Sequence, residues 1–176
     1  MIYEPAEDSY LLEKEVRKYA KGKRVLDIGS GSGIQALAAR DSGASYVLAT
    51  DVNSAVIREL KKKRINAVES DLFKNIRGKF DLVIFNPPYL PRDKREDEES
   101  ERITSGGERG DEIIVRFLLS LGKHLGDRGI ALIVLSSLTP KKRILESLRK
   151  NGLSRKIIAR EKRFMEKLEV WKIKFE

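Results

Sequence analysis

Leu26-Asp27-Ile28-Gly29-Ser30-Gly31-Ser32-Gly33 is the stretch that decides the fold of this 176-residue chain. It completes a short apolar run, residues 24–28, and leads directly into a segment of helical periodicity that begins at Ile34. A buried strand, a glycine-rich turn and a helix in this order are typical of a parallel α/β sheet. Because glycine adopts backbone conformations that side chains exclude, such a turn also lets a ligand approach the backbone closely.

Helical and strand-like periodicity alternate along the rest of the chain. An opening helix is expected over residues 6–20, with Glu7 and Asp8 favourable to its dipole. Further helices are expected at residues 34–42, 54–64, 111–125 and 140–150, and further strands at residues 46–50, 67–69, 80–85 and 130–136. Residues 155–160 and 168–175 predict an antiparallel pair that closes the sheet. The predicted fold class is therefore α/β, a mostly parallel sheet with helices on both faces.

Composition limits the class of protein. Hydrophobic residues make up 40% of the chain and charged residues 36%, and the longest apolar runs are too short to span a membrane. The first five residues lack the basic and apolar regions of a signal peptide, so we expect one cytoplasmic domain over residues 1–176, with no membrane contact. The chain has no cysteine and one histidine, His124. We therefore expect no metal site, no disulfide and no thiol catalysis.

The net charge of +9 is concentrated near the carboxyl terminus. Residues 139–176 contain 13 Lys or Arg and 5 Glu, a balance of +8. Two interpretations remain open. This basic carboxyl-terminal segment can face RNA or an RNA-rich assembly such as the ribosome, or it can be a solvated surface with excess lysine.

Polar residues follow each of the first four predicted strands. Asp27 and the glycine turn end the first strand, Asp51 the second, Asp71 the third, and Asn86-Pro87-Pro88-Tyr89 the fourth. In open parallel sheets, ligands bind beyond the carboxyl ends of the strands. The sequence therefore predicts that these residues form one site.

The glycine turn favours a cationic ligand over a pyrophosphate. Its spacing is G-x-G-x-G, and the preceding carboxylate of Asp27 would repel a pyrophosphate but suits the amino group of S-adenosylmethionine. Asp51, 20 residues beyond Gly31, can accept hydrogen bonds from both ribose hydroxyls, and Asp71 can accept one from the adenine amino group. Each Asp alone is more often a cap or turn residue, so their joint placement carries the prediction.

The Asn86–Tyr89 motif carries the predicted chemistry. Its two prolines remove two backbone donors and stiffen the turn, so the side chain of Asn86 and the carbonyl of Pro87 can accept hydrogen bonds from one NH2 group. Tyr89 offers a flat face on which a planar substrate can stack. The motif predicts methyl transfer to a planar, amide-like nitrogen, whose hydrogens become stronger donors as the nitrogen gains positive charge.

With these motifs the chain resembles the class I methyltransferases of the HemK-like protein-glutamine group. Residues 26–33 resemble the cofactor loop of that family, and Asn86–Tyr89 its catalytic motif. Residues 3–9 and 104–110 are similar to segments of the archaeal and eukaryotic branch, which modifies release factors in translation termination. The resemblance implies a seven-stranded Rossmann-like sheet of order 3-2-1-4-5-7-6, with an antiparallel last strand.

The resemblance also implies a set of site residues. Residues 1–20 would form a helix over the cofactor, and residues 90–110 a loop on the substrate side, although the charged insert 92–102 matches no family motif. Contacts to S-adenosylmethionine are expected from Ser9, Asp27, Gly29, Gly31, Asp51, Asp71, Leu72 and Asn86. Substrate contacts are expected from Asn86, Pro87, Pro88 and Tyr89, with catalysis by Asn86, Pro87 and Tyr89.

The family substrate is the glutamine of a Gly-Gly-Gln loop in a peptide-release factor. Relatives in the same branch bind a small zinc-ribbon activator protein, so we expect a heterodimer in which the activator adds a strand beside residues 67–69 and covers Ile65 and Val68. Three alternatives remain open: an adenine-N6 methyltransferase on RNA or DNA, a side activity on lysine, and a catalytically silent RNA-binding module.

Overall fold

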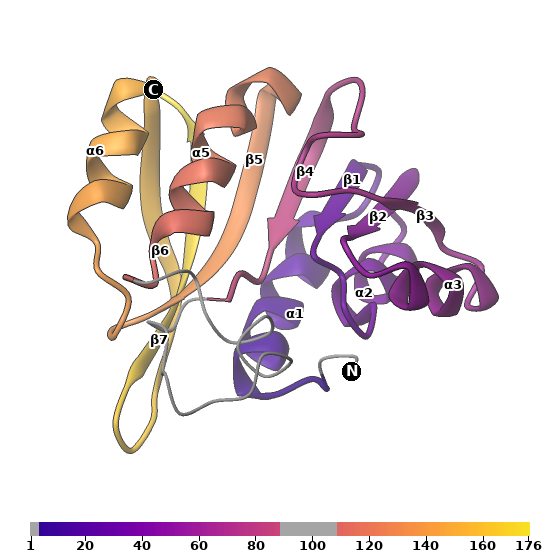
Figure 1. The fold of residues 1–176 in the computed structure, drawn as a ribbon, viewed down its shortest axis with the longest axis horizontal. Coiled ribbons are helices and arrows are strands. Elements are labelled where there is room, and N and C mark those ends of the chain that lie inside the picture. The colour runs from indigo at the N-terminus through magenta and orange to yellow at the C-terminus, as the bar shows by residue number, and fades with distance from the viewer. Residues whose placement is uncertain (1–3, 89–108) are drawn as a thin grey trace.

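The computed structural model of the chain describes residues 4–88 and 109–176, which form a seven-stranded sheet flanked by helices (Figure 1). The helices are α1 (Glu7–Tyr19), α2 (Ile34–Asp41), α3 (Ser54–Lys62), α5 (Glu112–His124) and α6 (Lys142–Lys150). The strands are β1 (Arg24–Ile28), β2 (Tyr46–Asp51), β3 (Asn66–Glu69), β4 (Phe80–Phe85), β5 (Leu125–Ser136), β6 (Leu153–Lys162) and β7 (Lys167–Phe175).

The strand order is β3-β2-β1-β4-β5-β7-β6, which confirms the predicted order. The first five of these strands pair in parallel, whereas β7 runs antiparallel to both of its neighbours, β5 and β6. Consequently β6 is parallel to β5, and six strands end at the same side of the sheet. We call this side the carboxyl edge.

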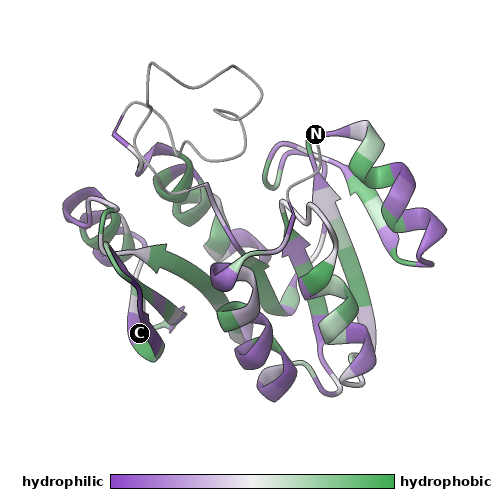
Figure 2. Ribbon diagram, turned by 90° about the horizontal axis from the view of Figure 1, so that it is seen from below, coloured by the Kyte–Doolittle hydropathy of each residue, from purple (hydrophilic) through white to green (hydrophobic). Residues whose placement is uncertain are grey.

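Alternating side chains along the strands build two cores, one on each face of the sheet. On one face α1, α2 and α3 pack against residues such as Val25 and Leu82; on the other α5 and α6 pack against neighbours such as Leu26 and Val83. Figure 2 shows hydrophobic residues along the strands and polar residues on the outer helix surfaces. None of the helices in the described ranges has the length and apolar character needed to cross a membrane.

The β3 edge differs in one respect from the expectation. Ile65 is only 4% exposed in the core beneath α3, so it is not available to a partner, and the prediction that an activator covers it is wrong. Val68 is 37% exposed on β3, and Val52, just beyond the end of β2, is 66% exposed. The exposed apolar side chain on β3 itself is therefore Val68.

Candidate active site

The glycine turn after β1 is fixed by hydrogen bonds to the end of β2. The amide of Ser30 donates to the carbonyl of Thr50 at 2.8 Å, and the amide of Gly31 donates to Oδ2 of Asp51 at 3.0 Å. Gly33 has φ +83°, and a Cβ at this position would lie 2.5 Å from Cδ2 of Leu60. Only glycine fits at residue 33, and the turn is thereby packed tightly between β1 and α3.

Asp51 is held in one orientation at the carboxyl edge. Its Oδ2 accepts from Gly31, and its Oδ1 accepts from the amide of Asn53 at 2.9 Å. A carboxylate has about four acceptor positions, so each oxygen retains one for a ligand. A half-buried, pre-oriented carboxylate with two remaining acceptor positions suits a pair of ribose hydroxyls.

Asp27 is a buried carboxyl group with an unmet hydrogen-bonding capacity. The residue is 1% exposed, and its Oδ2 has no hydrogen-bond partner within residues 4–88 and 109–176. Burial raises the pKa of Asp27 to about 7, and the negative charge of the nearby Asp51 also raises it. Hydrogen bonds to the Asp27 carboxyl group act in the opposite direction and lower the pKa. An ammonium group would restore the charged form and satisfy the orphaned oxygen. The site therefore fits the amino group of S-adenosylmethionine.

The raised pKa of Asp27 predicts a pH-dependent cofactor affinity. S-adenosylhomocysteine, which carries the same amino group, should bind about five- to tenfold more tightly at pH 7.5 than at pH 6, because the ligand requires the carboxylate. Calorimetric titrations at the two pH values measure this change. In Asp27→Asn the affinity should be the same at both pH values. An unchanged pH dependence in that variant would contradict the assignment of Asp27 as the group that binds the amino group.

The same group sets the sign of a stability change in the protein without ligand. The pKa of Asp27 in the folded state is raised above its unfolded value of 3.8, so the folded chain binds more protons between about pH 4 and pH 7. The contribution of Asp27 to stability therefore decreases as the pH rises through that window. The bound ammonium group should remove this loss.

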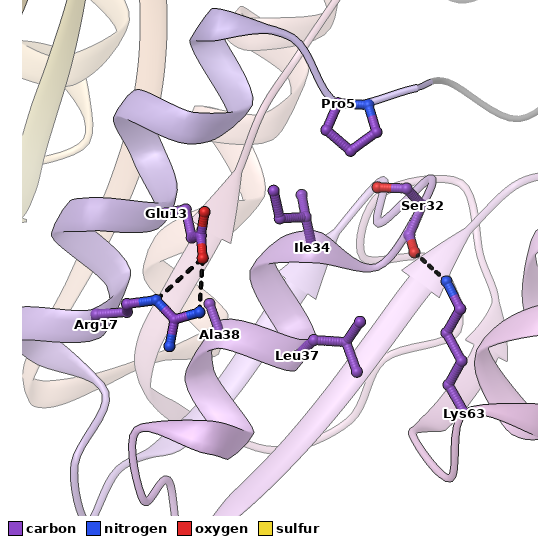
Figure 3. A pocket seen from close by; sticks show the side chains of 8 residues that line it. All are labelled: Pro5, Glu13, Arg17, Ser32, Ile34, Leu37, Ala38 and Lys63. Atoms are coloured by element: carbon purple, nitrogen blue, oxygen red, sulfur yellow. Dashed lines mark hydrogen bonds and ion pairs between the residues drawn. The ribbon is translucent and has the colours of Figure 1, made fainter.

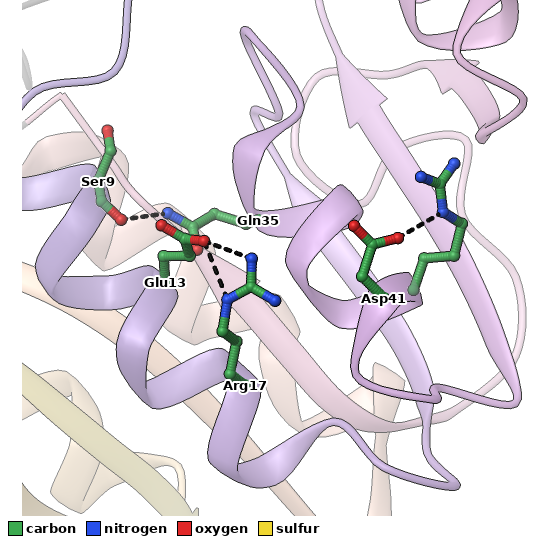
Figure 4. Close-up of polar contacts among 6 residues, drawn as sticks. Ser9, Glu13, Arg17, Gln35 and Asp41 are labelled. Atoms are coloured by element: carbon green, nitrogen blue, oxygen red, sulfur yellow. Dashed lines mark hydrogen bonds and ion pairs between the residues drawn. The ribbon is translucent and has the colours of Figure 1, made fainter.

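Asn86 lies at the end of β4 with its amide orientation set by α1. Its Nδ2 donates to Oδ2 of Asp8 at 3.4 Å and to Oγ of Ser9 at 3.3 Å. Its Oδ1 is buried and has no hydrogen-bond partner among the described residues. Ser9 is itself fixed, because Nε2 of Gln35 on α2 donates to its carbonyl at 2.8 Å (Figure 4). Asn86 therefore presents a fixed and unused acceptor.

Asp71 and Leu72 lie in the turn that follows β3. Nη2 of Arg116 on α5 donates to Oδ2 of Asp71 at 2.7 Å, and both side chains are about half exposed. Leu72 is 9% exposed and has φ +50°, and its carbonyl accepts from the hydroxyl of Ser70 at 2.9 Å. Asp71 thus has a competing partner that the sequence did not indicate, since Arg116 is 45 residues away in the chain.

The remaining predicted residues have the following positions. Gly29 is exposed at the carboxyl edge with φ +64°, Pro87 is buried and Pro88 is half-buried. Tyr89 and residues 90–108 of the predicted loop lie outside the described residues. The site that the structure brings together therefore consists of the glycine turn, Asp27, Asp51, the Asp71 turn and Asn86, with Ser9 above it.

Asp8 is a site residue that the sequence did not identify. It was interpreted only as an acidic residue favourable to the dipole of α1, but it is 5% exposed and holds Asn86. Its position one residue before Ser9, in the first turn of the opening helix, was the only available signal.

A pocket of about 340 Å³ is lined mainly by residues of α1 and α2 (Figure 3). It lies on the outer side of α2, with Ile34 and Leu37 on one wall and Glu13 and Arg17 of α1 on another. It contains Ser32 of the glycine turn but none of the predicted cofactor residues. The pocket therefore adjoins the glycine turn without including the predicted cofactor residues.

The sheet order, the glycine turn and the acidic strand ends together define a class I S-adenosylmethionine-dependent methyltransferase. The family described as the methyltransferase small domain matches residues 7–165. A Methanocaldococcus jannaschii protein described as a protein N5-glutamine methyltransferase is 39% identical over 177 residues, covering 96% of this chain and 89% of that protein. Human methyltransferase HEMK2 is 31% identical over 170 residues, covering 86% of this chain and 79% of that protein.

A solved structure agrees with these relatives. The E. cuniculi Mtq2–Trm112 complex, described as responsible for methylation of the termination factor eRF1, has a TM-score of 0.82 and 28% identity, and the match covers 99% of each chain. The chain belongs to the methyltransferase small domain family and, within it, to the HemK-like protein-glutamine methyltransferases. S-adenosylmethionine is accordingly its cofactor, as predicted.

Proposed function

We propose that this chain methylates the side-chain amide nitrogen of a glutamine in the Gly-Gly-Gln loop of a peptide-release factor. The observation that carries the proposed chemistry, methyl transfer to a planar NH2 group, is the geometry of Asn86. Its NH2 group is occupied by Asp8 and Ser9, so its buried Oδ1 is the acceptor that remains for a substrate. An acceptor without a partner in a buried position is costly unless a ligand satisfies it.

An amide nitrogen is a weak nucleophile because its lone pair is delocalised into the carbonyl. When bound, S-adenosylmethionine supplies the methyl group. As the amide nitrogen gains positive charge, its hydrogens become stronger donors, and Oδ1 of Asn86 accepts one of them more strongly than in the ground state. The carbonyl of Pro87 is expected to accept the other. The proton is lost afterwards to water, and Asn86 remains unchanged.

The adenine-N6 amine also presents two hydrogens on a planar group. The Asn86 geometry suits both acceptors, so the choice of glutamine rests on the relatives. Two matches that span nearly the whole of this chain, at 39% and 28% identity, are described as a protein N5-glutamine methyltransferase and as responsible for methylation of a termination factor. These matches support a protein substrate for the present chain.

A partner at β3 forms part of the proposal. The E. cuniculi enzyme was solved together with Trm112. Among the described strands β3 pairs with β2 alone, which leaves one side of its backbone unpaired, and Val68 is exposed on this strand. An unpaired edge with an exposed apolar side chain is suited to an added strand from a small activator protein of the zinc-ribbon type.

Transfer of a labelled methyl group tests the proposed function. The enzyme, with and without a co-expressed activator, is incubated with labelled S-adenosylmethionine and with a release factor, ribosomal RNA or DNA. Label should enter the release factor alone, and a variant of that factor with the acceptor glutamine changed to alanine should remain unlabelled. Label in either nucleic acid and none in the release factor would contradict the proposal.

A further inference from the structure

The turn between β6 and β7 exposes two large apolar side chains next to each other. Phe164 is 99% exposed and Met165 is 77% exposed. They occupy the centre of a four-residue turn that is closed by a hydrogen bond of 2.7 Å from the amide of Arg163 to the carbonyl of Glu166. We call residues 163–166 the hairpin tip. Adjacent apolar side chains of this size are unfavourable in water unless a partner covers them.

The hairpin tip extends past the carboxyl edge, on the side where the active site lies. Strands β1 and β4 end in one row of the sheet, at Ile28 and Phe85, and Trp171 of β7 continues that row. The hairpin continues for four more residues, to Lys167, which is about 13 Å at the usual rise of about 3.3 Å per residue. Figure 1 shows this hairpin projecting beyond the other strands.

Three contacts hold the hairpin tip and its base against α1 and the end of β5. Arg163 forms an ion pair with Glu7 in the first turn of α1, and Ser136, the last residue of β5, donates a hydrogen bond to Glu166. The amide of Ser137 donates to the carbonyl of Lys167 at 2.8 Å. A tip fixed in this way can bind a partner without losing much conformational freedom.

The contact with α1 also links the hairpin tip to the catalytic amide. Glu7 is followed directly by Asp8 and Ser9, which hold Nδ2 of Asn86. A protein bound at the tip would therefore be positioned relative to Asn86 through one turn of helix. This places the tip on the route of a substrate chain that presents its glutamine at the end of β4.

The charges at the base of the tip define the chemistry of the partner. Lys162 and Lys167 lie directly opposite each other in the β6–β7 register and are both exposed. Neither forms an ion pair within the described part of the chain. Like charges opposite each other are destabilising in a β pair, so this arrangement favours a partner that brings carboxylates. The complementary surface of the partner therefore has an apolar side chain flanked by acidic groups.

We infer that the hairpin tip is a docking element for the protein substrate and contacts an apolar, acid-flanked segment of the release factor outside its acceptor loop. The inference rests on the proposed function, because it takes the release factor as the occupant. It adds to that function a recognition surface separate from the residues that hold the glutamine. Phe164 and Met165 provide the buried contact, and Lys162 and Lys167 provide its charged rim.

The double variant Phe164→Ser/Met165→Ser tests the docking element. With intact release factor, kcat/KM should fall about 10- to 100-fold through KM, the range expected when a buried apolar anchor is lost. A short peptide that carries only the Gly-Gly-Gln acceptor should be methylated at the unchanged rate. Leu119→Ser on α5 is the matched control, because Leu119 is 58% exposed but lies in the middle of its helix. It should behave as wild type with both substrates.

Binding measured without turnover separates this inference from the proposed reaction. In calorimetry, wild-type enzyme should bind the intact release factor, and the double variant should bind it correspondingly more weakly. If wild-type enzyme binds the release factor and the double variant binds it more weakly, the docking element is supported. This holds even if no glutamine is methylated, in which case only the proposed reaction is wrong. Equal binding by both proteins, no binding by wild type, or an equal loss of activity with the short peptide would overturn the docking element. A dimer that forms with wild-type enzyme but not with the double variant would also overturn the docking element.

Discussion

Replacing Asn86 by alanine is expected to lower kcat about 100- to 1,000-fold, the usual effect of removing one preorganised polar group from a transition state. The variant removes the buried Oδ1 that remains without a partner in the described structure. Its affinity for S-adenosylmethionine should change far less, since Asp27 and Asp51 remain in place. Single-turnover rates with saturating cofactor, together with calorimetric binding, measure the two effects separately.

Variants of Asp8 provide the matched controls for Asn86. Asp8→Asn keeps an oxygen that can accept from Nδ2 of Asn86, whereas Asp8→Ala removes it. We expect Asp8→Asn to retain most of the turnover and Asp8→Ala to lose part of it, because Ser9 is then the one partner of the Asn86 amide group among residues 4–88 and 109–176. Near-normal turnover in Asn86→Ala would contradict the mechanism, whatever turnover the two Asp8 variants show.

Replacing Asp51 by alanine is expected to weaken cofactor binding about 10- to 100-fold. A hydrogen bond to a charged group contributes about 1.5–3 kcal/mol, and the ribose would lose such bonds. The variant also removes the acceptor that orients the amides of Gly31 and Asn53, so the glycine turn itself loses a support. Calorimetry with S-adenosylhomocysteine measures the affinity directly.

A surface aspartate separates this effect from a general loss of negative charge. Asp41, at the end of α2, is about half exposed and pairs only with the neighbouring Arg40 in the described structure (Figure 4). Asp41→Ala should bind the cofactor as wild type does. Unchanged affinity in Asp51→Ala, or an equal loss in Asp41→Ala, would show that Asp51 does not hold the ribose.

Much of the fold could be predicted because β1, β2 and β4 are short, apolar strands bounded by turn residues. The bounds of β1 and β4 agree with the predicted ranges, and α2 and α3 begin at the predicted residues. The start of β5 was predicted five residues too late, at Ile130 instead of Leu125. Gly126-Asp127-Arg128-Gly129 has the composition of a turn, but the structure continues the strand through it with a register shift against β4.

The glycines explain why this segment remains part of the strand. A Cβ at Gly129 would lie 2.9 Å from the carbonyl oxygen of Phe80, so the close approach of β5 to the start of β4 requires glycine. Alternation alone also could not determine which of the last two strands lies beside β5. The interior position of β7 followed from the family resemblance, and the structure confirms it.

The candidate site could be predicted where residues follow directly from strand ends. Asp27, Asp51 and Asn86 lie together because six strands end at one edge. The residues that hold Asn86 and the hairpin tip could not be found in this way, because their contacts cross long stretches of chain. Asn86 is 78 residues from Asp8, and Arg163 is 156 residues from Glu7. Such pairings depend on how helices and hairpins pack, which local patterns do not determine.

Mass spectrometry of the methylated product tests the central claim most directly. Wild-type enzyme is incubated with S-adenosylmethionine and a mixture of release factor and ribosomal RNA, and the modified residue is located by fragmentation. The account predicts one methyl group on the side-chain nitrogen of the glutamine in the Gly-Gly-Gln loop, and almost none with Asn86→Ala. A methyl group on an adenine amine, with the release factor unmodified, would contradict it.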